Sequence, residues 1–441
     1  MGHQEKTILI ITSSGGSGHL QAAKAKHLEI IKQNPSAKVI VVDILLDWIG
    51  KRIGRFFVNQ WNQAQAEGNV SKLNRLISLQ ILQDFFFSTP IFFKTLFLLK
   101  QHKINHIIDT QPSLTSPIIK AIKWVEKKEN RKIKFEKILT ELPTHYCFHF
   151  FDPIKNLSKK DKNTLRLVTS QPLLYPNQTQ EAFWRDFCNL ETENIDYQEM
   201  PLRPTFKSLI QTKPLRAFLN LPIQFHSEEE KELIRETLQK GHLTFLIEHE
   251  KIHITLSPDE KIFTLMLGSI PAEKKTLFYV NEIIETIKWE STKEKSYSLF
   301  VFCNDHVPRK RSLLKQVHDL VMKKQNFPIN LTVIPMSFQD DSVIAPLYYW
   351  SHMTLTRSGG LTAMELLAIA QGQICIHSEA KDETKPNQGM PDWEYGNALY
   401  LQRKRGAKLL TTSCFGKQAK TLLLSEKSGC EKLNMLMKSL S

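Results

Sequence analysis

The N-terminal segment constrains the fold most strongly, because it combines a short apolar run with a glycine-rich turn. The run Thr7–Thr12, TILIIT, is rich in β-branched residues and leads into SSGGSGH. A helix is expected over about residues 20–33, ended by Asn34-Pro35, and a second buried strand over residues 38–44. Strand, glycine turn, helix and strand form the βαβ unit of a parallel sheet, so we predict an α/β protein.

The chain is too long for a single domain of this kind. Hydrophobic cores usually stop growing near roughly 250–300 residues, whereas this chain has 441. Two further apolar runs that end in polar residues continue the first sheet, at residues 106–109 and 137–140. Five more predict a second sheet, at residues 263–267, 298–303, 331–334, 353–356 and 374–377. We therefore predict two facing Rossmann-like, doubly wound domains, with a cleft between them at the carboxyl ends of the strands.

We place the first domain at residues 1–205 and the second at residues 206–416. We interpret the segment PLRPTF as the interdomain connection, in which two prolines stiffen the chain. Residues 213–260 are charged and weakly patterned, and we expect them to open the second domain and to contain an irregular insertion. Residues 417–441 are expected to form a helix and tail that pack back on the first domain.

The formal net charge of +14 is the one unusual bulk property. A basic surface attracts nucleic acid, anionic lipid or phosphorylated substrates without distinguishing among them. The sequence has no helix-turn-helix, RNP or zinc-finger signature, so nucleic acid is not an expected partner. Nucleotide sugars and membrane surfaces remain as the partners to consider.

The six cysteines and the N-terminal residues are typical of a cytoplasmic protein. The cysteines are scattered without a CxxC pair, a pattern typical of reduced thiols in a cytoplasmic protein and not of a zinc site. No basic segment followed by a long apolar stretch opens the chain, so a secretory signal is not expected. No clean apolar stretch reaches about 18 residues, which argues against a transmembrane helix.

A long helical stretch, residues 47–103, separates the second predicted strand from the third. It contains DWIGKRIGRFFVNQW and DFFFSTPIFFKTLFLLK, both rich in aromatic and cationic residues. Buried helices would account for this pattern. A surface that dips into a membrane interface would account for it equally well, with anionic headgroups meeting Lys51, Arg52, Arg55 and Lys94.

Two glycine turns stand between a strand and a helix. In SSGGSGH, Gly15, Gly16 and Gly18 let the backbone approach a ligand, and the following helix start offers free N–H groups. The turn is neither a Walker A loop nor a GxGxxG fingerprint, since position 21 is Gln. His19 makes it more specific, because a neutral imidazole at the helix start can accept a proton from an attacking hydroxyl.

The second turn, TRSGGLTAMELLA, is again followed by a helix that can cradle a diphosphate. Glu365 lies about one turn into that helix, where a carboxylate can accept hydrogen bonds from ribose hydroxyls or simply complement the helix dipole. A later segment, DWEYGNA, opens another helix with carboxylates and an amide that suit sugar hydroxyls, although the same residues are ordinary helix-capping chemistry.

The order of these features resembles one group of glycosyltransferases. The chain is similar to the family 28-like enzymes, which include monogalactosyldiacylglycerol synthases, bacterial diacylglycerol glucosyltransferases and the peptidoglycan lipid I N-acetylglucosaminyltransferase. The matching segments are SSGGSGH, VVDILLDW, IIDTQPS, LTELPTH, PLRPTF, the stretch from MSFQDD to MELLA, and WEYGNALYL. The resemblance covers most of the chain and implies the GT-B architecture, with a nucleotide sugar bound on the C-terminal domain.

Carried over by position, the resemblance implies a role for each matching residue. His19 would be the catalytic general base. The loop near the acceptor and the diphosphate would be formed by Gly15, Gly16, Ser17, Gly18 and Glu141. The donor nucleotide would be bound by Ser269, Phe338, Gln339, Arg357, Ser358, Gly359, Gly360, Thr362 and Glu365, with Glu365 on the ribose. The donor sugar would be bound by Asp392, Glu394 and Asn397.

The resemblance implies transfer of a hexose from a UDP-sugar to an acceptor hydroxyl, with inversion. The expected acceptor is a membrane lipid such as diacylglycerol, reached by peripheral association of a cytoplasmic protein with an anionic membrane. No metal or other cofactor is required, since helix dipoles can hold the diphosphate, and Asp340-Asp341 is expected to be a loop or helix cap. The alternatives are a nucleotide-sugar 2-epimerase or hydrolase of the same fold, and a catalytically vestigial membrane-binding protein.

Overall fold

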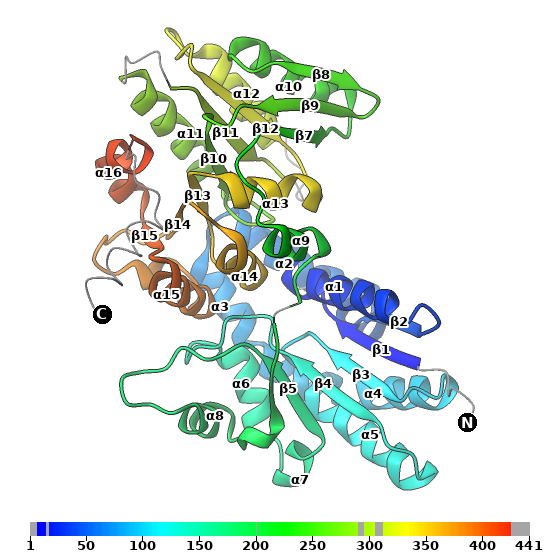
Figure 1. The fold of residues 1–441 in the computed structure, drawn as a ribbon. Helices are drawn as coiled ribbons and strands as arrows, with labels where there is room; N and C mark the ends of the chain where they lie inside the picture. The colour runs from blue at the N-terminus through cyan, green and yellow to red at the C-terminus, as the bar shows by residue number, and fades with distance from the viewer. Residues whose placement is uncertain (1–6, 15–16, 200, 290–294, 305–311, 425–441) are drawn as a thin grey trace.

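Two parallel sheets, one above the other in Figure 1, organise the chain. The structure is a computed structural model that describes residues 7–14, 17–199, 201–289, 295–304 and 312–424. Each sheet has six strands and is flanked by helices. The predicted fold class, α/β with two Rossmann-like domains, is confirmed.

The first sheet has the strand order β2-β1-β3-β4-β5-β6, with parallel neighbours. All six residues of β1 are buried, as a strand covered by helices on both faces requires. The strands are β1 (Thr7–Thr12), β2 (Lys38–Asp43), β3 (His106–Asp109), β4 (Lys134–Ile138), β5 (Leu165–Thr169) and β6 (Ile195–Tyr197). The helices are α1 (Ser17–Gln33), η1 (Ile44–Ile49), α2 (Lys51–Ala66), α3 (Val70–Ser78), α4 (Gln80–Gln101), α5 (Thr115–Glu129), α6 (Phe148–Lys155), α7 (Lys159–Lys162), α8 (Gln180–Cys188) and η2 (Thr192–Asn194).

The second sheet has the order β12-β11-β10-β13-β14-β15, which is 3-2-1-4-5-6 when counted from β10. This order is typical of doubly wound sheets that bind nucleotides where the order reverses, here between β10 and β13. The strands are β10 (Lys261–Met266), β11 (Tyr297–Phe302), β12 (Leu331–Met336), β13 (Met353–Thr356), β14 (Gln373–His377) and β15 (Lys408–Leu410). The helices are α9 (Pro204–Thr212), α10 (Glu228–Lys240), α11 (Glu273–Lys288), α12 (Leu313–Lys323), α13 (Asp341–Trp350), α14 (Gly360–Ile369), η3 (Pro386–Gly389), α15 (Asp392–Arg405) and α16 (Thr412–Leu424).

The segment at residues 213–260 is regular, so the expected irregular insertion is wrong. It forms a three-stranded antiparallel sheet of β7 (Leu219–Gln224), β9 (Lys251–Leu256) and β8 (Phe245–Glu248), accompanied by α10. Its inward side chains, among them Ile223 and Ile254, join the core of the second domain. The alternation of buried and exposed residues in β7 and β9 is typical of antiparallel strands with one buried face, and the sequence analysis did not recognise it.

The C-terminal helix also departs from expectation. Helix α16 was expected to pack on the first domain, but it packs against α11, beside the second sheet in Figure 1. Its buried residues Phe415, Ala419 and Leu423 belong to the core around β10, β11 and α11. The helix therefore covers the apolar side of α11 and completes the core of its own domain. The tail after Leu424 lies outside the described residues.

The aromatic stretch is helical, as predicted, but only one face of it is buried. Helix α4 packs against α5 through side chains that include Ile91 and Leu99. Its other face exposes Phe85, Phe93 and Phe97, each at least 60% accessible. Within the described ranges, no helix is long and apolar enough to cross a membrane.

A buried ion pair ties the centre of the first sheet together. Lys137 Nζ lies 2.8 Å from Asp109 Oδ2, and both side chains are fully inaccessible. The same ammonium donates to the carbonyl oxygen of Gln111 at 2.6 Å. The pair fixes the carboxyl ends of β3 and β4 beside each other, directly behind the helix α1 that carries His19.

Removing this cation should destabilise the first domain. In Lys137→Met, Asp109 keeps its burial and loses its counter-charge, which costs about 3–5 kcal/mol. Urea unfolding should therefore shift strongly, whereas Lys132→Met, at an exposed position on the same segment, should change little. The double variant Asp109→Asn/Lys137→Met should recover part of the loss. Equal stability of Lys137→Met and wild type would contradict the structural role of the pair.

Candidate functional site

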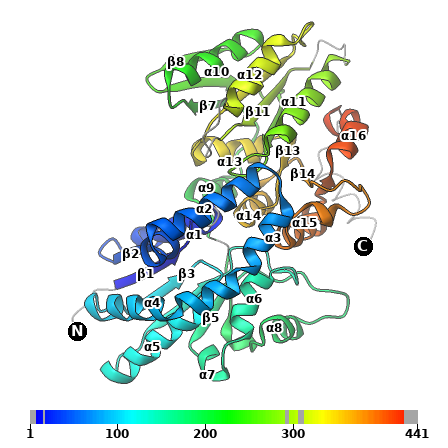
Figure 2. The same ribbon diagram turned by 180° about the vertical axis from the view of Figure 1, so that it is seen from behind.

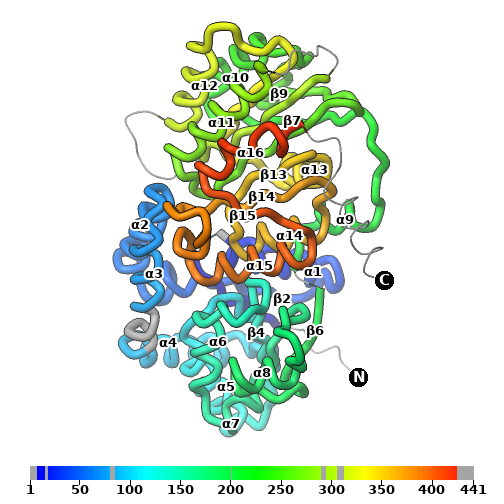
Figure 3. Tube along the Cα trace, turned by 90° about the vertical axis from the view of Figure 1, so that its left-hand side faces the viewer, coloured from blue at the N-terminus to red at the C-terminus, as the bar shows by residue number. Residues whose placement is uncertain are grey.

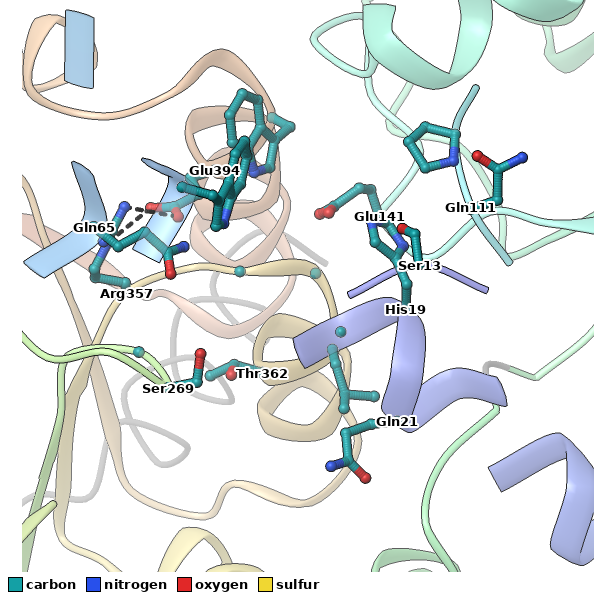
Figure 4. Close-up of a pocket in the computed structure, with 18 of the residues that line it drawn as sticks. Ser13, His19, Gln21, Gln65, Gln111, Glu141, Ser269, Arg357, Thr362 and Glu394 are labelled. Carbon is teal, nitrogen blue, oxygen red and sulfur yellow. Dashed lines mark hydrogen bonds and ion pairs between the residues drawn. The ribbon is translucent and has the colours of Figure 1, made fainter. Parts of the chain in front are cut away.

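A cavity of about 250 Å³ lies between the two domains. Its walls come from the segments that follow β1 and β3 in the first sheet and β10 and β13 in the second. These are the points where the strand order of each sheet reverses, the usual ligand position in open α/β sheets. Figure 4 shows side chains from both domains pointing into this space. The predicted cleft is therefore present, and both sheets contribute to it.

Two helix N-termini face each other across the cavity. Helix α1 begins at Ser17, earlier than predicted, so Gly18 and His19 lie in its first turn. A Cβ on Gly18 would come within 3.9 Å of Leu361 Cβ, in the first turn of α14. Among the described residues no side chain caps α14, and its first turn holds no acidic residue. Unpaired N–H groups of this kind bind anions such as a diphosphate.

Gly360 explains how close the two domains come. A Cβ at this position would lie 2.0 Å from the carbonyl oxygen of Thr140, which no side chain could tolerate. The neighbouring Gly359, by contrast, faces open space. The glycine pair therefore has two functions: one glycine allows the first domain to dock, and the other leaves the cavity free for a ligand.

Glu365 is held by an arginine from the interdomain connection. Arg203 Nε lies 2.8 Å from Glu365 Oε1, and Nη2 lies 3.0 Å from Oε2. The guanidinium also stacks 4.6 Å from the Phe206 ring. Burial raises the pKa of Glu365, and the charge of Arg203 opposes that shift. The bidentate pair fixes the carboxylate plane at the cavity wall.

A second bidentate pair lies at the other end of the cavity. Arg357 Nη2 is 2.9 Å from Glu394 Oε1, and Nε is 3.1 Å from Oε2. Ser358 does not line the cavity: its hydroxyl donates to the carbonyl oxygen of Glu394 at 2.7 Å and so joins the turn to α15. Figure 4 shows Arg357 and Glu394 side by side, with Gln65 from α2 beside them.

His19 lines the cavity from the first domain. Its Nδ1 lies 2.8 Å from Thr140 Oγ1, which fixes the ring orientation. Burial lowers the pKa of His19 from 6.5 to about 4, and the positive charge of Lys137 acts in the same direction. The imidazole is therefore neutral near pH 7 and has a lone pair to offer. A second histidine, His149, also lines the cavity, and burial together with His19 lowers its pKa to about 3.

Glu141 is the most perturbed carboxyl group in the cavity. Burial raises the pKa of this group from 4.5 to about 8, and the charge of Glu394 adds to the rise, whereas a hydrogen bond donated by Asn397 lowers it. The side chain therefore carries a proton near neutral pH. A protonated carboxyl can donate a hydrogen bond or a proton to a bound ligand.

Not every residue predicted for the site reaches the cavity. Asn397 is buried as a link between domains: its Oδ1 accepts from the Leu142 N–H at 2.8 Å, and its Nδ2 donates to Glu141 and to the Ser358 carbonyl oxygen. Asp392 is exposed at the start of α15 and does not line the cavity. Gly15 and Gly16 lie outside the described residues, as does the side chain of Ser17. The predicted residues that line the cavity are Gly18, His19, Glu141, Ser269, Phe338, Gln339, Arg357, Gly359, Gly360, Thr362, Glu365 and Glu394.

Several cavity residues were missed by the sequence analysis. Arg203 stands in the PLRPTF connection, where a lone cation between prolines could have indicated a buried partner. Trp61 and Gln65 of α2 belong to the stretch interpreted as either buried helix or membrane-facing surface, and His149 of α6 lies outside the motifs considered. Nothing in the sequence links these residues to the glycine turns. Their positions depend on how the chain folds back over the cleft.

Among the described residues, no set of three or more His, Cys, Asp or Glu side chains is placed to hold a metal ion. Asp340 caps α13, accepting a hydrogen bond from the Ser342 N–H at 2.8 Å. The prediction of a loop or helix cap at Asp340-Asp341 is thus confirmed in its second form for Asp340, and Asp341 is the first residue of the helix.

Comparison with known proteins gives similarities of fold. No protein-family model matches the chain, and no curated protein sequence matches it significantly. Among solved structures, MurG from Acinetobacter baumannii is 12% identical, with 99% of this chain and 90% of that one covered and a TM-score of 0.45. A putative UDP-N-acetylglucosamine 2-epimerase from Listeria monocytogenes is 10% identical, with 96% and 90% covered and a TM-score of 0.45. An alpha,alpha-trehalose-phosphate synthase (UDP-forming) from Burkholderia xenovorans is 11% identical, with 96% and 93% covered and a TM-score of 0.42. These similarities assign the chain to no family.

The raised pKa of Glu141 predicts a specific pH dependence of stability. The folded protein keeps a proton that the unfolded chain releases above about pH 4.5. This carboxyl's contribution to stability is therefore complete below about pH 4.5 and is lost progressively as the pH rises to about 8. In Glu141→Gln, urea midpoints should fall less between pH 5 and pH 8 than in wild type. The exposed Glu191→Gln should follow wild type, and an unchanged slope in Glu141→Gln would contradict the assignment.

Proposed function

We propose that this protein is a glycosyltransferase that moves a hexose from a UDP-sugar to an acceptor hydroxyl. The observation that carries the proposal is the opposition of His19 to the uncapped N-terminus of α14, with Glu365 one turn further along that helix. A candidate base (His19), an anion site (the N-terminus of α14) and a carboxylate that can accept from ribose hydroxyls (Glu365) thus line one cavity between two domains. In this proposal the base would activate the acceptor hydroxyl, the anion site would hold the diphosphate and the carboxylate would bind the ribose.

The donor would lie on the second domain. Its diphosphate would accept hydrogen bonds from the first-turn amides of α14, at Gly359 and Gly360, where the helix dipole also favours negative charge. The ribose hydroxyls would donate to Glu365, whose carboxylate Arg203 already orients. The base would lie against the backbone at Phe338 and Gln339. Glu394, held by Arg357, would accept from hydroxyls of the sugar.

His19 would act as the general base. When its Nδ1 donates to Thr140 Oγ1, Nε2 is the atom left to take a proton from the acceptor hydroxyl. The pKa of His19, lowered to about 4 by burial, suits a neutral resting state. A bound diphosphate would raise it, because a nearby negative charge favours the imidazolium. The hydroxyl would then attack the anomeric carbon opposite the departing UDP, which inverts the configuration.

A membrane lipid is the acceptor that we propose. We use the name aromatic face for the exposed side chains Ile53, Phe56, Phe85, Phe86, Phe93 and Phe97 of α2 and α4. Exposed Lys51, Arg52 and Arg55 stand beside it on α2, a combination that suits an anionic membrane surface. Phe57, next to Phe56 in the chain, lines the cavity. Helix α2 therefore connects the aromatic face directly with the site.

One observation favours a second candidate, a nucleotide-sugar 2-epimerase or hydrolase. Glu141 and Glu394 line the same cavity, and the charge of Glu394 contributes to the raised pKa of Glu141. Two acids near the anomeric carbon are what such an enzyme would use. It would convert the UDP-sugar without any acceptor, whereas the transferase requires one. A vestigial membrane-binding protein would bind vesicles and no nucleotide.

Calorimetry with UDP and UDP-hexoses, followed by transfer assays, tests the proposed donor site and base together. Glu365→Gln should weaken UDP binding about tenfold or more, because one charged hydrogen-bond acceptor is lost, while the exposed Glu248→Gln should leave it unchanged.

His19→Ala should abolish transfer and keep UDP affinity within about threefold, since His19 would contact the acceptor and not the nucleotide. Wild-type turnover by His19→Ala would contradict the base, and failure of the wild-type protein to bind UDP would contradict the function.

The aromatic face can be tested separately with vesicles. Burying one phenylalanine in an interface contributes roughly 1.5–3 kcal/mol, so Phe85→Ser/Phe86→Ser should weaken binding to phosphatidylglycerol-containing vesicles by at least tenfold. Phe218→Ser removes an equally exposed phenylalanine from the second domain and should have no effect. Equal losses in both variants, or no vesicle binding by wild type, would contradict membrane association through this face.

A further inference from the structure

A helical arm of the first domain reaches across to the second. The arm consists of α2 and α3, and it begins at Gly50, whose φ of 115° lets the chain turn sharply after η1. Figures 2 and 3 show these two helices extending beside the second domain, close to α15. The arm thus brings part of the first domain close to α15, the helix that carries Glu394 (Figures 2 and 3).

Three contacts hold the arm on the second domain. The rings of Trp61 and Trp393 stack with centroids 5.8 Å apart and an interplanar angle of 21°. Ala64 and Leu73 bury themselves in the same small cluster with Trp393. At the turn between the helices, a Cβ on Gly68 would lie 2.6 Å from Glu379 Oε1. The arm therefore closes over α15, the helix that carries Glu394.

The arm also presents polar groups at the cavity. Trp61 and Gln65 are one helical turn apart, so they share a face of α2, and both line the cavity. In Figure 4 the Gln65 amide lies beside Arg357 and Glu394 and points into the open space. Trp61 Nε1 is buried, and none of the described residues offers it a hydrogen-bond acceptor. A buried donor without an acceptor costs free energy and calls for a partner from outside the chain.

The chemistry of these groups is complementary to that of Glu394 across the cavity. A carboxylate only accepts hydrogen bonds, an indole N–H only donates, and an amide does both. A sugar hydroxyl that donates to Glu394 keeps lone pairs with which it can accept from the arm. A phosphate would be repelled by Glu394, and an apolar chain would leave the Trp61 N–H and the Gln65 amide without partners. The set therefore suits a polyhydroxylated ring.

We infer that the arm completes the donor-sugar site, with the Trp61 N–H and the Gln65 amide bound to hydroxyls of the transferred hexose. This inference rests on the proposed function and adds two specificity-determining residues from the first domain. The sugar site would then be complete only when the arm lies on α15, whereas the ribose and diphosphate sites belong to the second domain alone. The hexose would be enclosed between the stacked indoles and the Arg357–Glu394 pair.

The test compares two ligands that differ only in the hexose. Trp61→Phe keeps an aromatic ring against Trp393 and removes the N–H, and Gln65→Met keeps the length and removes the amide. Both variants should lose about five- to tenfold in affinity for the UDP-hexose that wild type binds, and keep UDP affinity within twofold, as measured by calorimetry. Trp289→Phe, at an exposed tryptophan of the second domain, is the matched control and should change neither.

The outcomes separate the inference from the proposed function. If both variants bind the UDP-hexose as wild type does, or lose UDP and UDP-hexose affinity equally, the arm does not recognise the sugar and only this inference fails. Loss of acceptor binding with UDP-hexose affinity intact would assign Trp61 and Gln65 to the acceptor and also overturn it. If wild type binds neither UDP nor a UDP-hexose, the proposed function fails, and the inference fails with it.

Discussion

The site depends on one geometric constraint: parallel strands send their carboxyl ends, and the helix N-termini that follow, to the same edge of a sheet. Two such edges face each other here, which brings the first turns of α1 and α14 to opposite walls of one cavity. The approach is possible only because Gly360 has no side chain where the Thr140 carbonyl oxygen lies. Backbone amides therefore supply the positive potential of the cavity, and they do so without rearrangement when an anion arrives.

Buried ion pairs set the orientation of the side chains around that cavity. Arg203 and Arg357 hold Glu365 and Glu394 through two hydrogen bonds each, and Lys137 stands behind His19. Desolvating such pairs is costly, so they are weak evidence for a gain in stability. Their value here is that the carboxylate planes are fixed before a ligand binds. The conformational entropy of these carboxylates is therefore lost on folding and not on ligand binding, which favours tight and specific hydrogen bonding.

The sequence predicted the fold and part of the cavity lining for a common reason. Buried β-branched runs followed by glycines identify strand ends, and residues in the next helical turn, such as His19 and Glu365, must lie at the cleft. Asn397 shows the limit of this reasoning: it follows Glu394 by three residues on α15, yet it faces the first domain and not the cavity. Trp61 and Arg203 were not predicted because long-range packing, and no local pattern, brings them to the site.

The contacts of Arg203 indicate how the two halves of the site are assembled. Its guanidinium bonds to Glu365 of α14 and stacks on Phe206 of α9, both in the second domain. A relative motion of the domains that pivots on the first-domain side of Arg203 would leave the Arg203–Glu365 pair intact. The Asn397 links and the Trp61–Trp393 stack, in contrast, join the two domains and would break on opening. On the proposed function, opening at these contacts would keep the nucleotide half of the site and take apart the sugar half, so nucleotide binding would precede the enclosure of the hexose.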